Sequence, residues 1–364
     1  MKLKVSHKCF IFVMFFFCML FVSGCSVVQL EDRSFPMAIG IDKQENMSEL
    51  LLSFDFPDLK KASGGDKEDE TPAAVTIEAD QFYKAQKAYE NNTNRTIDYN
   101  HLKALVFGKD FIADSNKVRE LFSWLEYQEV LARNTCLFIA DPTASEMLSL
   151  TEGTQGSVGK FLEEMVQSQP DFRKSKVMTI GKLMNQWHNQ NEMLLIPILT
   201  NNGGIPTITS YAVMKRFEFV GTMSVDDAMI SFLSQGMVKK LEYELSDQTV
   251  LEIQNISRNI VISEVNGKPE LTVEIKGNAL PKNVLNMPPK ELEQLKYKLD
   301  QQLTQTMNAT ANQMLMEHKI DITNSYILLG GYNRKLYDVY YNYPERYEEE
   351  LTLKYDISIT ILNY

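Results

Sequence analysis

The C-terminal stretch Leu351-Thr352-Leu353-Lys354-Tyr355-Asp356-Ile357-Ser358-Ile359-Thr360-Ile361 decides the fold of its half of the chain. Apolar and polar side chains alternate along it, which predicts a long strand with one buried face. A second segment, Lys290 to Glu317, carries apolar residues at three- and four-residue spacings, which predicts a helix long enough to cross one whole face of a sheet. These apolar residues are Leu292, Leu295, Leu299, Leu303, Met307, Ala311 and Met314. We expect the strand and the helix to cover one another.

Further strands precede the long helix. Four short segments with strand-like composition follow one another, and Asn266-Gly267 between the last two is typical of a tight hairpin turn. The segments are Val238 to Glu244, Thr249 to Gln254, Asn259 to Val265 and Glu270 to Lys276. Grouped strands with a long helix on one face indicate an α+β fold, with mixed or antiparallel sheets, flanking helices and at least two domains.

The N-terminal half alternates between predicted strands and helices, and it forms an α/β region over residues 36–202 that can divide into two subdomains. The charged segment 58–72 contains Gly64-Gly65 and is expected to be a mobile loop. Asn201-Asn202-Gly203-Gly204-Ile205-Pro206 is the strongest loop signal in the middle of the chain. We therefore place the main domain boundary there, with a C-terminal α+β domain over residues 206–364.

The first residues read as a secretion signal. Lys2, Lys4 and Lys8 precede the unbroken apolar run Phe10 to Val22, which at 13 residues is too short to span a bilayer as a helix. Ser23-Gly24-Cys25 then resembles the lipobox of bacterial lipoproteins. We expect residues 1–24 to be a signal peptide, Cys25 to carry N-palmitoyl and S-diacylglycerol groups, and residues 25–35 to be a tether. An ordinary signal peptide or an anchor helix with a chance cysteine stays open.

The charge of the chain limits its partners. The 364 residues carry a net charge of -11. Removing residues 1–24 takes away Lys2, Lys4 and Lys8 and no acidic residue, so the mature charge is -14. An acidic body does not hold nucleic acid by its overall charge, and an anionic membrane repels it. Membrane attachment must therefore come from the lipid, on the extracytoplasmic face.

No local pattern in the sequence supports catalysis. His101, His188 and His318 lie in separate segments, and no zinc or nucleophile signature is present. Cys136 lies in an apolar run and reads as a buried small side chain in a strand. We therefore expect no catalytic residue, no metal ligand, no cofactor and no enzymatic activity.

Three other segments have an ordinary explanation beside a functional one. Gly153 to Lys160 departs from the phosphate-loop spacing, since Phe161 follows the lysine, and reads as a flexible loop. Asp66 to Glu70 lacks the glycine and terminal glutamate of a calcium loop and reads as a solvated charge run. Five tyrosines are expected to pack between helix and terminal strand, and carbohydrate or membrane-interface contact and a partner-protein surface stay open as alternatives. They are Tyr337, Tyr340, Tyr341, Tyr343 and Tyr347.

Several segments together resemble the Ger(x)C family, the lipoprotein C subunits of nutrient germinant receptors in endospore-forming bacteria. The resemblance covers nearly the whole chain and depends on the shared order of loose motifs. They are Ser23-Gly24-Cys25 followed by Glu31-Asp32-Arg33, then Met37 to Asp42, Asn100 to Gly108, Tyr211 to Gly221, and the C-terminal order of long helix, tyrosine-rich segment and strand. The chain departs from the family at Leu30 to Arg33, where members often have a tryptophan or a glutamate-arginine pair. It also departs at Ala309, Ala311 and Tyr347, where members often have a cysteine in the long helix and tryptophans near its end.

The resemblance implies a non-catalytic subunit, lipid-anchored at Cys25 in the spore inner membrane. Such a subunit assembles with integral membrane A and B subunits and is required for nutrient-triggered germination. The resemblance does not identify the nutrient or any residue that binds the nutrient.

Two other classes stay open. A lipoprotein solute receptor of an envelope transport system is the main alternative, although the strand-rich second half does not favour its two repeated α/β lobes. A lipid-anchored envelope hydrolase would need a nucleophile or a metal cluster, and the sequence contains no signature of either.

Overall fold

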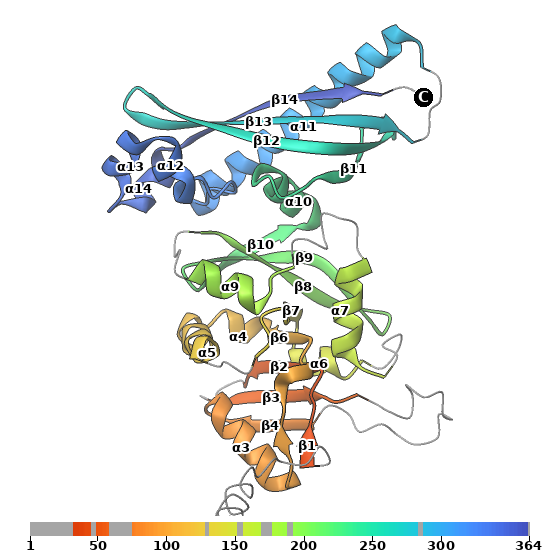
Figure 1. Cartoon of the computed structure of the whole chain (residues 1–364), viewed down its shortest axis with the longest axis vertical. Coiled ribbons are helices and arrows are strands. Elements are labelled where there is room, and N and C mark those ends of the chain that lie inside the picture. Colours follow the sequence, from red (N-terminus) through yellow and green to blue (C-terminus); the bar gives the residue numbers. More distant parts are fainter. Residues whose placement is uncertain are drawn as a thin grey trace, which may run out of the picture.

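The computed structural model describes residues 32–44, 49–57, 75–127, 131–150, 156–168, 177–187, 192–282 and 287–362. Figure 1 shows an elongated molecule, with an N-terminal lobe around one sheet at the lower end and a second sheet with its long helix at the upper end. Residues 1–24, Cys25 and the segment 58–72, for which we predicted a signal peptide, a lipidation site and a mobile loop, lie outside the described residues.

An eight-stranded sheet forms the N-terminal lobe, in the order β10-β9-β8-β7-β6-β2-β3-β4. The four central strands β8, β7, β6 and β2 are parallel, and antiparallel hairpins extend the sheet on both sides. Because helices cover the central strands, these strands are apolar along their length rather than alternating. The strands are β2 (Ala38–Lys43), β3 (Leu50–Asp55), β4 (Val75–Ala79), β6 (Ala104–Gly108), β7 (Cys136–Asp141), β8 (Leu194–Asn202), β9 (Ile205–Lys215) and β10 (Glu218–Ser224).

Helices cover both faces of this sheet. One face packs against α3 (Phe82–Thr93), α4 (Lys109–Ile112), α5 (Ser115–Tyr127) and α9 (Ile180–Trp187), and it forms a closed apolar core. The other face packs against α6 (Ala144–Leu148) and α7 (Val158–Ser168), and its core continues into the C-terminal lobe. The two lobes therefore share one hydrophobic core.

A small parallel pair of strands lies at the lower end of the molecule. It joins β1 (Arg33–Ser34) to β5 (Thr96–Ile97), and η2 (Tyr99–His101) follows. Arg33 Nη1 donates to Asp98 Oδ2 at 2.8 Å, and the Asp98 amide donates to the Ser34 carbonyl at 2.8 Å. Arg33 and Ser34 of the predicted tether therefore belong to the folded lobe, because these contacts hold them beside β5.

The C-terminal lobe is a four-stranded sheet in the order β11-β12-β13-β14. The long helix α11 (Pro289–His318) packs on one face, and the burial of β14 alternates as the sequence predicts. Asn266 and Gly267 both have positive φ at the β12–β13 turn, in agreement with the predicted hairpin. The strands are β11 (Lys240–Glu244), β12 (Val250–Val265), β13 (Lys268–Pro281) and β14 (Thr352–Ile361). The α+β class, with mixed and antiparallel sheets and flanking helices, is confirmed.

Short helices join the two lobes and close the upper one. Helix α10 (Val225–Ser234) connects β10 to β11, and Ser224 caps it by accepting from the Asp227 amide, as expected for a serine N-cap. The remaining elements are η3 (Ser325–Leu328), α12 (Leu329–Tyr332), α13 (Arg334–Tyr340) and α14 (Pro344–Glu350).

Two features differ from the sequence-based expectation. Two strands predicted before Asn266 form the single strand β12, with an irregularity between Gln254 and Ser257 that accommodates Asn255 and Ile256. Gly203 and Gly204 form the turn of the β8–β9 hairpin inside the eight-stranded sheet. Glycine, asparagine and proline indicate a change of chain direction, and here that change is a hairpin turn. The chain leaves the eight-stranded sheet only after β10.

Candidate functional site

The structure describes one of the two cysteines for which the sequence made a prediction. Cys25 lies outside the described residues. Cys136 lies in β7 with 7% of its surface exposed, and burial raises the pKa of its thiol to about 11. A thiol with a raised pKa is rarely a thiolate at neutral pH and is therefore unreactive. The prediction of a buried small side chain in a strand is confirmed at Cys136.

The structure describes two of the three histidines considered above, and they belong to different lobes. The His101 ring contacts Phe35 edge to face, with centroids 5.2 Å apart, and His318 lies at the C-terminal end of α11. His188 lies outside the described residues, as does the acidic run Asp66 to Glu70. Among the residues that the structure describes, no three His, Cys, Asp or Glu side chains gather as a metal site would require.

The glycine-rich segment before Phe161 leads into a helix. Gly159 and Lys160 lie in the first turn of α7, and residues 151–155 lie outside the described part. Asp55 Oδ2 accepts from the Ser157 hydroxyl at 2.8 Å and from the Gly159 amide at 2.9 Å. A Cβ at Gly159 would lie 2.2 Å from the Met37 carbonyl oxygen. The glycine is therefore required for close packing of α7 on the sheet, in a segment that we predicted to be a flexible loop.

Asp42 plays a similar role at the start of α6. Its carboxylate accepts from the Ala144 amide at 2.7 Å and from the Ser145 amide at 2.8 Å. Burial raises the pKa of Asp42 and of Asp55 above the ordinary value, and the hydrogen bonds to the helix amides oppose that shift. These carboxylates hold helices against the sheet. Sequence analysis missed them because their partners lie about a hundred residues away.

A buried polar network connects the two lobes. The Asp321 carboxylate accepts from the amide and hydroxyl of Thr323 and from the amide and hydroxyl of Ser325, all within 2.8 Å. The Ser325 hydroxyl also lies 2.8 Å from the Tyr347 hydroxyl. The Asn324 side chain bonds both backbone groups of Met193, at 2.8 and 3.1 Å. The loop after α11 is thus tied to the residue that precedes β8.

An ion pair completes this junction. Lys215 at the end of β9 pairs with Glu348 of α14, and it also donates to the Lys319 carbonyl at 3.3 Å. The two side chains are 12% and 5% exposed. Burial raises the pKa of Glu348 to about 7, although the charge of Lys215 acts in the opposite direction. The junction therefore contains a carboxyl group that titrates near neutral pH.

The tyrosine cluster divides into buried and exposed members. Tyr340 and Tyr347 are fully buried and contact each other edge to face, so they pack as expected. Tyr341 and Tyr343 are 59% and 60% exposed. The packing interpretation therefore holds for Tyr340 and Tyr347, and a partner surface at the exposed tyrosines stays a prediction. Tyr341 and Tyr343 lie between α13 and α14.

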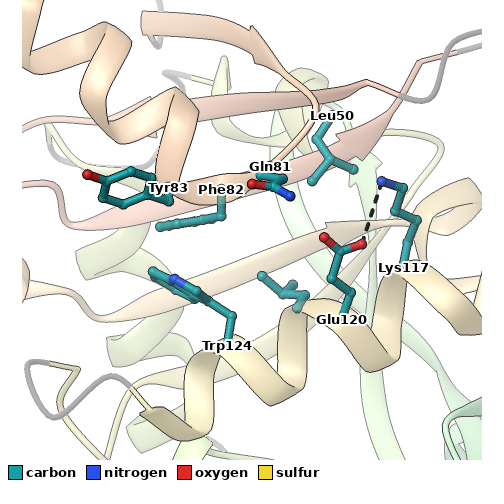
Figure 2. A pocket seen from close by; sticks show the side chains of 8 residues that line it. Leu50, Gln81, Phe82, Tyr83, Lys117, Glu120 and Trp124 are labelled. Carbon is teal, nitrogen blue, oxygen red and sulfur yellow. Dashed lines mark ion pairs between the residues drawn. The ribbon is translucent and has the colours of Figure 1, made fainter.

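An apolar pocket opens between α3 and α5. Its volume is about 200 Å³. Phe82 and Trp124 form its aromatic wall, with ring centroids 4.2 Å apart, and Figure 2 shows Tyr83 at its edge. An ion pair between Lys117 and Glu120 lies on the opposite side. The lining residues are Leu50, Gln81, Phe82, Tyr83, Lys117, Glu120, Leu121 and Trp124.

This arrangement defines the class of protein: an α+β protein of two lobes with a shared core. No described helix is both long and apolar enough to cross a membrane.

Comparison with known proteins identifies the family. A family model described as the spore germination protein N-terminal domain matches residues 26–201, and one described as spore germination B3/GerAC-like, C-terminal, matches residues 209–364. The chain belongs to the Ger(x)C family of spore germination proteins, as the sequence resemblance indicated. This is a family of non-enzymatic germinant receptor subunits, and membership implies association with a membrane.

The fold is similar to that in a solved structure titled "Crystal Structure of the GerBC protein". The two chains are 18% identical, the TM-score is 0.61, and the match covers 93% of this chain and 100% of the other. No curated protein matches the chain significantly.

Proposed function

We propose that the chain is a non-catalytic, lipid-anchored subunit of a nutrient germinant receptor, held in the spore inner membrane through Cys25 and assembled with integral membrane A and B subunits. One observation carries the proposal: two family models match nearly the whole chain in order, and the first begins at residue 26, directly after the lipobox cysteine. That position agrees with a mature chain that starts at Cys25.

The length of the tether supports an orientation at the membrane. Seven residue steps separate Cys25 from Asp32, where the described structure begins. A fully extended chain of that length spans about 25 Å. The end of the molecule that carries β1 and α3 would therefore lie close to the lipid surface, with the C-terminal lobe at the opposite end (Figure 1). Confinement of this kind raises the effective concentration of the subunit beside its membrane partners.

The buried polar groups support a role without catalysis. Asp42 and Asp55 bond the amides at the starts of α6 and α7, and Asp321 accepts four hydrogen bonds within its own loop. Each group thus stabilises the fold at its position. The subunit would contribute binding surfaces to the receptor rather than reactive groups.

A germination assay tests the proposal. Spores that lack this gene, or that carry Cys25→Ala, are exposed to amino acids, sugars and nucleosides, and spore membranes are fractionated in parallel. We expect the response to one nutrient class to be lost and the Cys25→Ala protein to leave the membrane fraction. Cys18→Ala is the matched control, because Cys18 lies in the predicted signal peptide, and this variant should stay in the membrane fraction and germinate normally.

Two outcomes would contradict the proposal. Normal responses to every nutrient in the deletion strain would remove the receptor role, and uptake assays for the solute-binding alternative would follow. Retention of the Cys25→Ala protein in membranes after a salt wash would show that the anchor is elsewhere.

A further inference from the structure

The pocket between α3 and α5 has an apolar end and a charged end. Four residues of α5 line the pocket at helical spacing, two charged side chains followed by two apolar ones. They are Lys117, Glu120, Leu121 and Trp124. Figure 2 shows Lys117 and Glu120 at one end of the pocket, and Trp124 below Phe82 at the other. A ligand that fills this pocket would therefore need one polar end and one apolar end.

The apolar end has the size and composition to receive an aromatic ring. Phe82 and Leu121 are each at most 5% exposed, and the Phe82 and Trp124 ring centroids are 4.2 Å apart. An apolar cavity of about 150 Å³ can hold a benzene molecule, whereas this pocket measures about 200 Å³. It is smaller than the pockets of about 300–1,000 Å³ that hold drug-sized molecules. A small molecule with a single ring therefore fits.

The charged end presents one charge of each sign. Lys117 Nζ lies 3.7 Å from Glu120 Oε2 and donates to the Asp80 carbonyl at 3.5 Å. Both distances exceed the roughly 2.7–2.9 Å of a charge-assisted hydrogen bond. The Lys117 and Glu120 side chains are 22% and 54% exposed. A ligand in the pocket can therefore form shorter hydrogen bonds with both charged groups.

Two opposite charges side by side favour a zwitterion over an ion of either sign. An anion beside Lys117 would also lie close to the Glu120 carboxylate, and a cation beside Glu120 would lie close to the Lys117 ammonium group. Like charges at such distances repel each other. An α-amino acid carries a carboxylate and an ammonium group on the same carbon atom, so it can place each group beside the opposite charge. The Gln81 amide, between the two ends of the pocket in Figure 2, can bond the same polar end.

We propose that the pocket between α3 and α5 binds a free amino acid with an aromatic side chain. The ring lies against Phe82 and Trp124, the carboxylate lies beside Lys117, and the ammonium group lies beside Glu120. This inference goes beyond the proposed function, since binding of such a solute requires neither the lipid anchor nor the A and B subunits.

Titration calorimetry with the full-length chain in detergent tests the site. The probe is L-phenylalanine, and three analogues each lack one of its parts. The analogue 3-phenylpropanoate lacks the ammonium group, 2-phenylethylamine lacks the carboxylate, and L-alanine lacks the ring. We expect L-phenylalanine to bind most tightly and each analogue to bind at least about tenfold more weakly, because each loses a charge-assisted hydrogen bond or the buried ring.

Two substitutions assign the charges to the pocket. Glu120→Gln should weaken the binding of L-phenylalanine about tenfold without weakening that of 3-phenylpropanoate, which has no ammonium group. Lys117→Gln should likewise weaken L-phenylalanine without weakening 2-phenylethylamine. Glu293→Gln is the matched control, because Glu293 is an exposed carboxylate on α11 in the other lobe, and it should leave every affinity unchanged. We expect all three variants to unfold at the wild-type temperature, since exposed ion pairs contribute little to stability.

The possible results separate this inference from the proposed function. Absence of saturable binding of L-phenylalanine, or equal affinities of the wild type and Glu120→Gln, would overturn the site and leave the receptor role to the germination assay. Binding of 3-phenylpropanoate as tight as that of L-phenylalanine would overturn recognition of a zwitterion. Normal germination of the deletion strain would contradict the proposed function alone, because calorimetry measures the chain without its partners.

Discussion

Glu348 shows how a single residue can couple the junction of the two lobes to pH. Its side chain is 5% exposed and pairs with Lys215, while the nearby Asp321 adds a like charge. Burial disfavours the charged form and raises the pKa of Glu348 from 4.5 to about 7. Between pH 4.5 and about pH 7, the Glu348 carboxyl is protonated in the native state and ionised in the unfolded chain.

The sign of the resulting pH dependence follows from linkage. The stabilising contribution of Glu348 is complete below about pH 4.5 and is lost as the pH rises through 7, because only the native state stays protonated in that range. Between pH 5 and 8 we expect the wild type to lose about 1–3 kcal/mol more unfolding free energy than Glu348→Gln. Urea titrations at several pH values measure this difference.

Glu345 on the same helix provides the control. It is exposed and pairs with Arg216, whose guanidinium lowers the pKa of Glu345 below its usual value. Glu345→Gln should therefore leave the profile between pH 5 and 8 parallel to that of the wild type. Parallel profiles for Glu348→Gln and the wild type would contradict the assignment of a near-neutral pKa to Glu348.

At the scale of elements, α11 and β14 stabilise the C-terminal lobe together. Each contributes one apolar face, and the two faces meet over much of the length of β14. Ile359 and Met307 are both fully buried in the resulting core. Among the helices that pack on this sheet, α11 makes the most extensive contact.

Two methionines on α11 test this arrangement. Met307 is fully buried, whereas Met316 on the same helix is 74% exposed. We expect Met307→Ala to lower the unfolding free energy by about 2–5 kcal/mol, because it removes buried apolar surface and leaves a cavity. Met316→Ala should change it by less than about 0.5 kcal/mol. Equal effects of the two substitutions in chemical denaturation would show that α11 does not pack on the sheet through this face.

At the scale of the whole molecule, the lobes are joined by a common core and by polar contacts across the junction. Asn324 bonds the backbone of Met193, 131 positions earlier in the chain, through both ends of its amide. Asn324 has a φ of 53°, in the left-handed region that asparagine and glycine adopt readily. A glycine at this position keeps the backbone conformation and removes the side-chain contacts.

We expect Asn324→Gly to lower the unfolding free energy by about 1–3 kcal/mol, because it leaves buried backbone groups of Met193 without these partners. Exchange of the Met193 amide with deuterium should become faster. Asn266→Gly is the control, since Asn266 has a φ of 52° in an exposed hairpin turn and should cost only a few tenths of a kcal/mol. Unchanged exchange at Met193 in Asn324→Gly would contradict a role of Asn324 in holding the lobes together.

Local patterns were sufficient for much of the fold. The alternation in Leu351 to Ile361, the spacing in α11 and the turn at Asn266-Gly267 were predicted correctly, because each depends on neighbours within a few residues. The motifs that indicated the family are also short, so each could be recognised from neighbouring residues alone. The one site residue indicated by the sequence, Cys25, lies outside the described residues and stays a prediction.

Only the tertiary structure decided how these elements combine. It placed β14 parallel to β13, continued one sheet through Gly203-Gly204, and joined Lys215 to Glu348 across 133 positions. It also formed the pocket from three segments that lie between Leu50 and Trp124. Contacts between distant segments depend on which apolar faces are buried together, and periodicity within one segment does not specify its partner. The sequence by itself therefore determined the elements and the family, and the packing of those elements determined the surfaces and the junction.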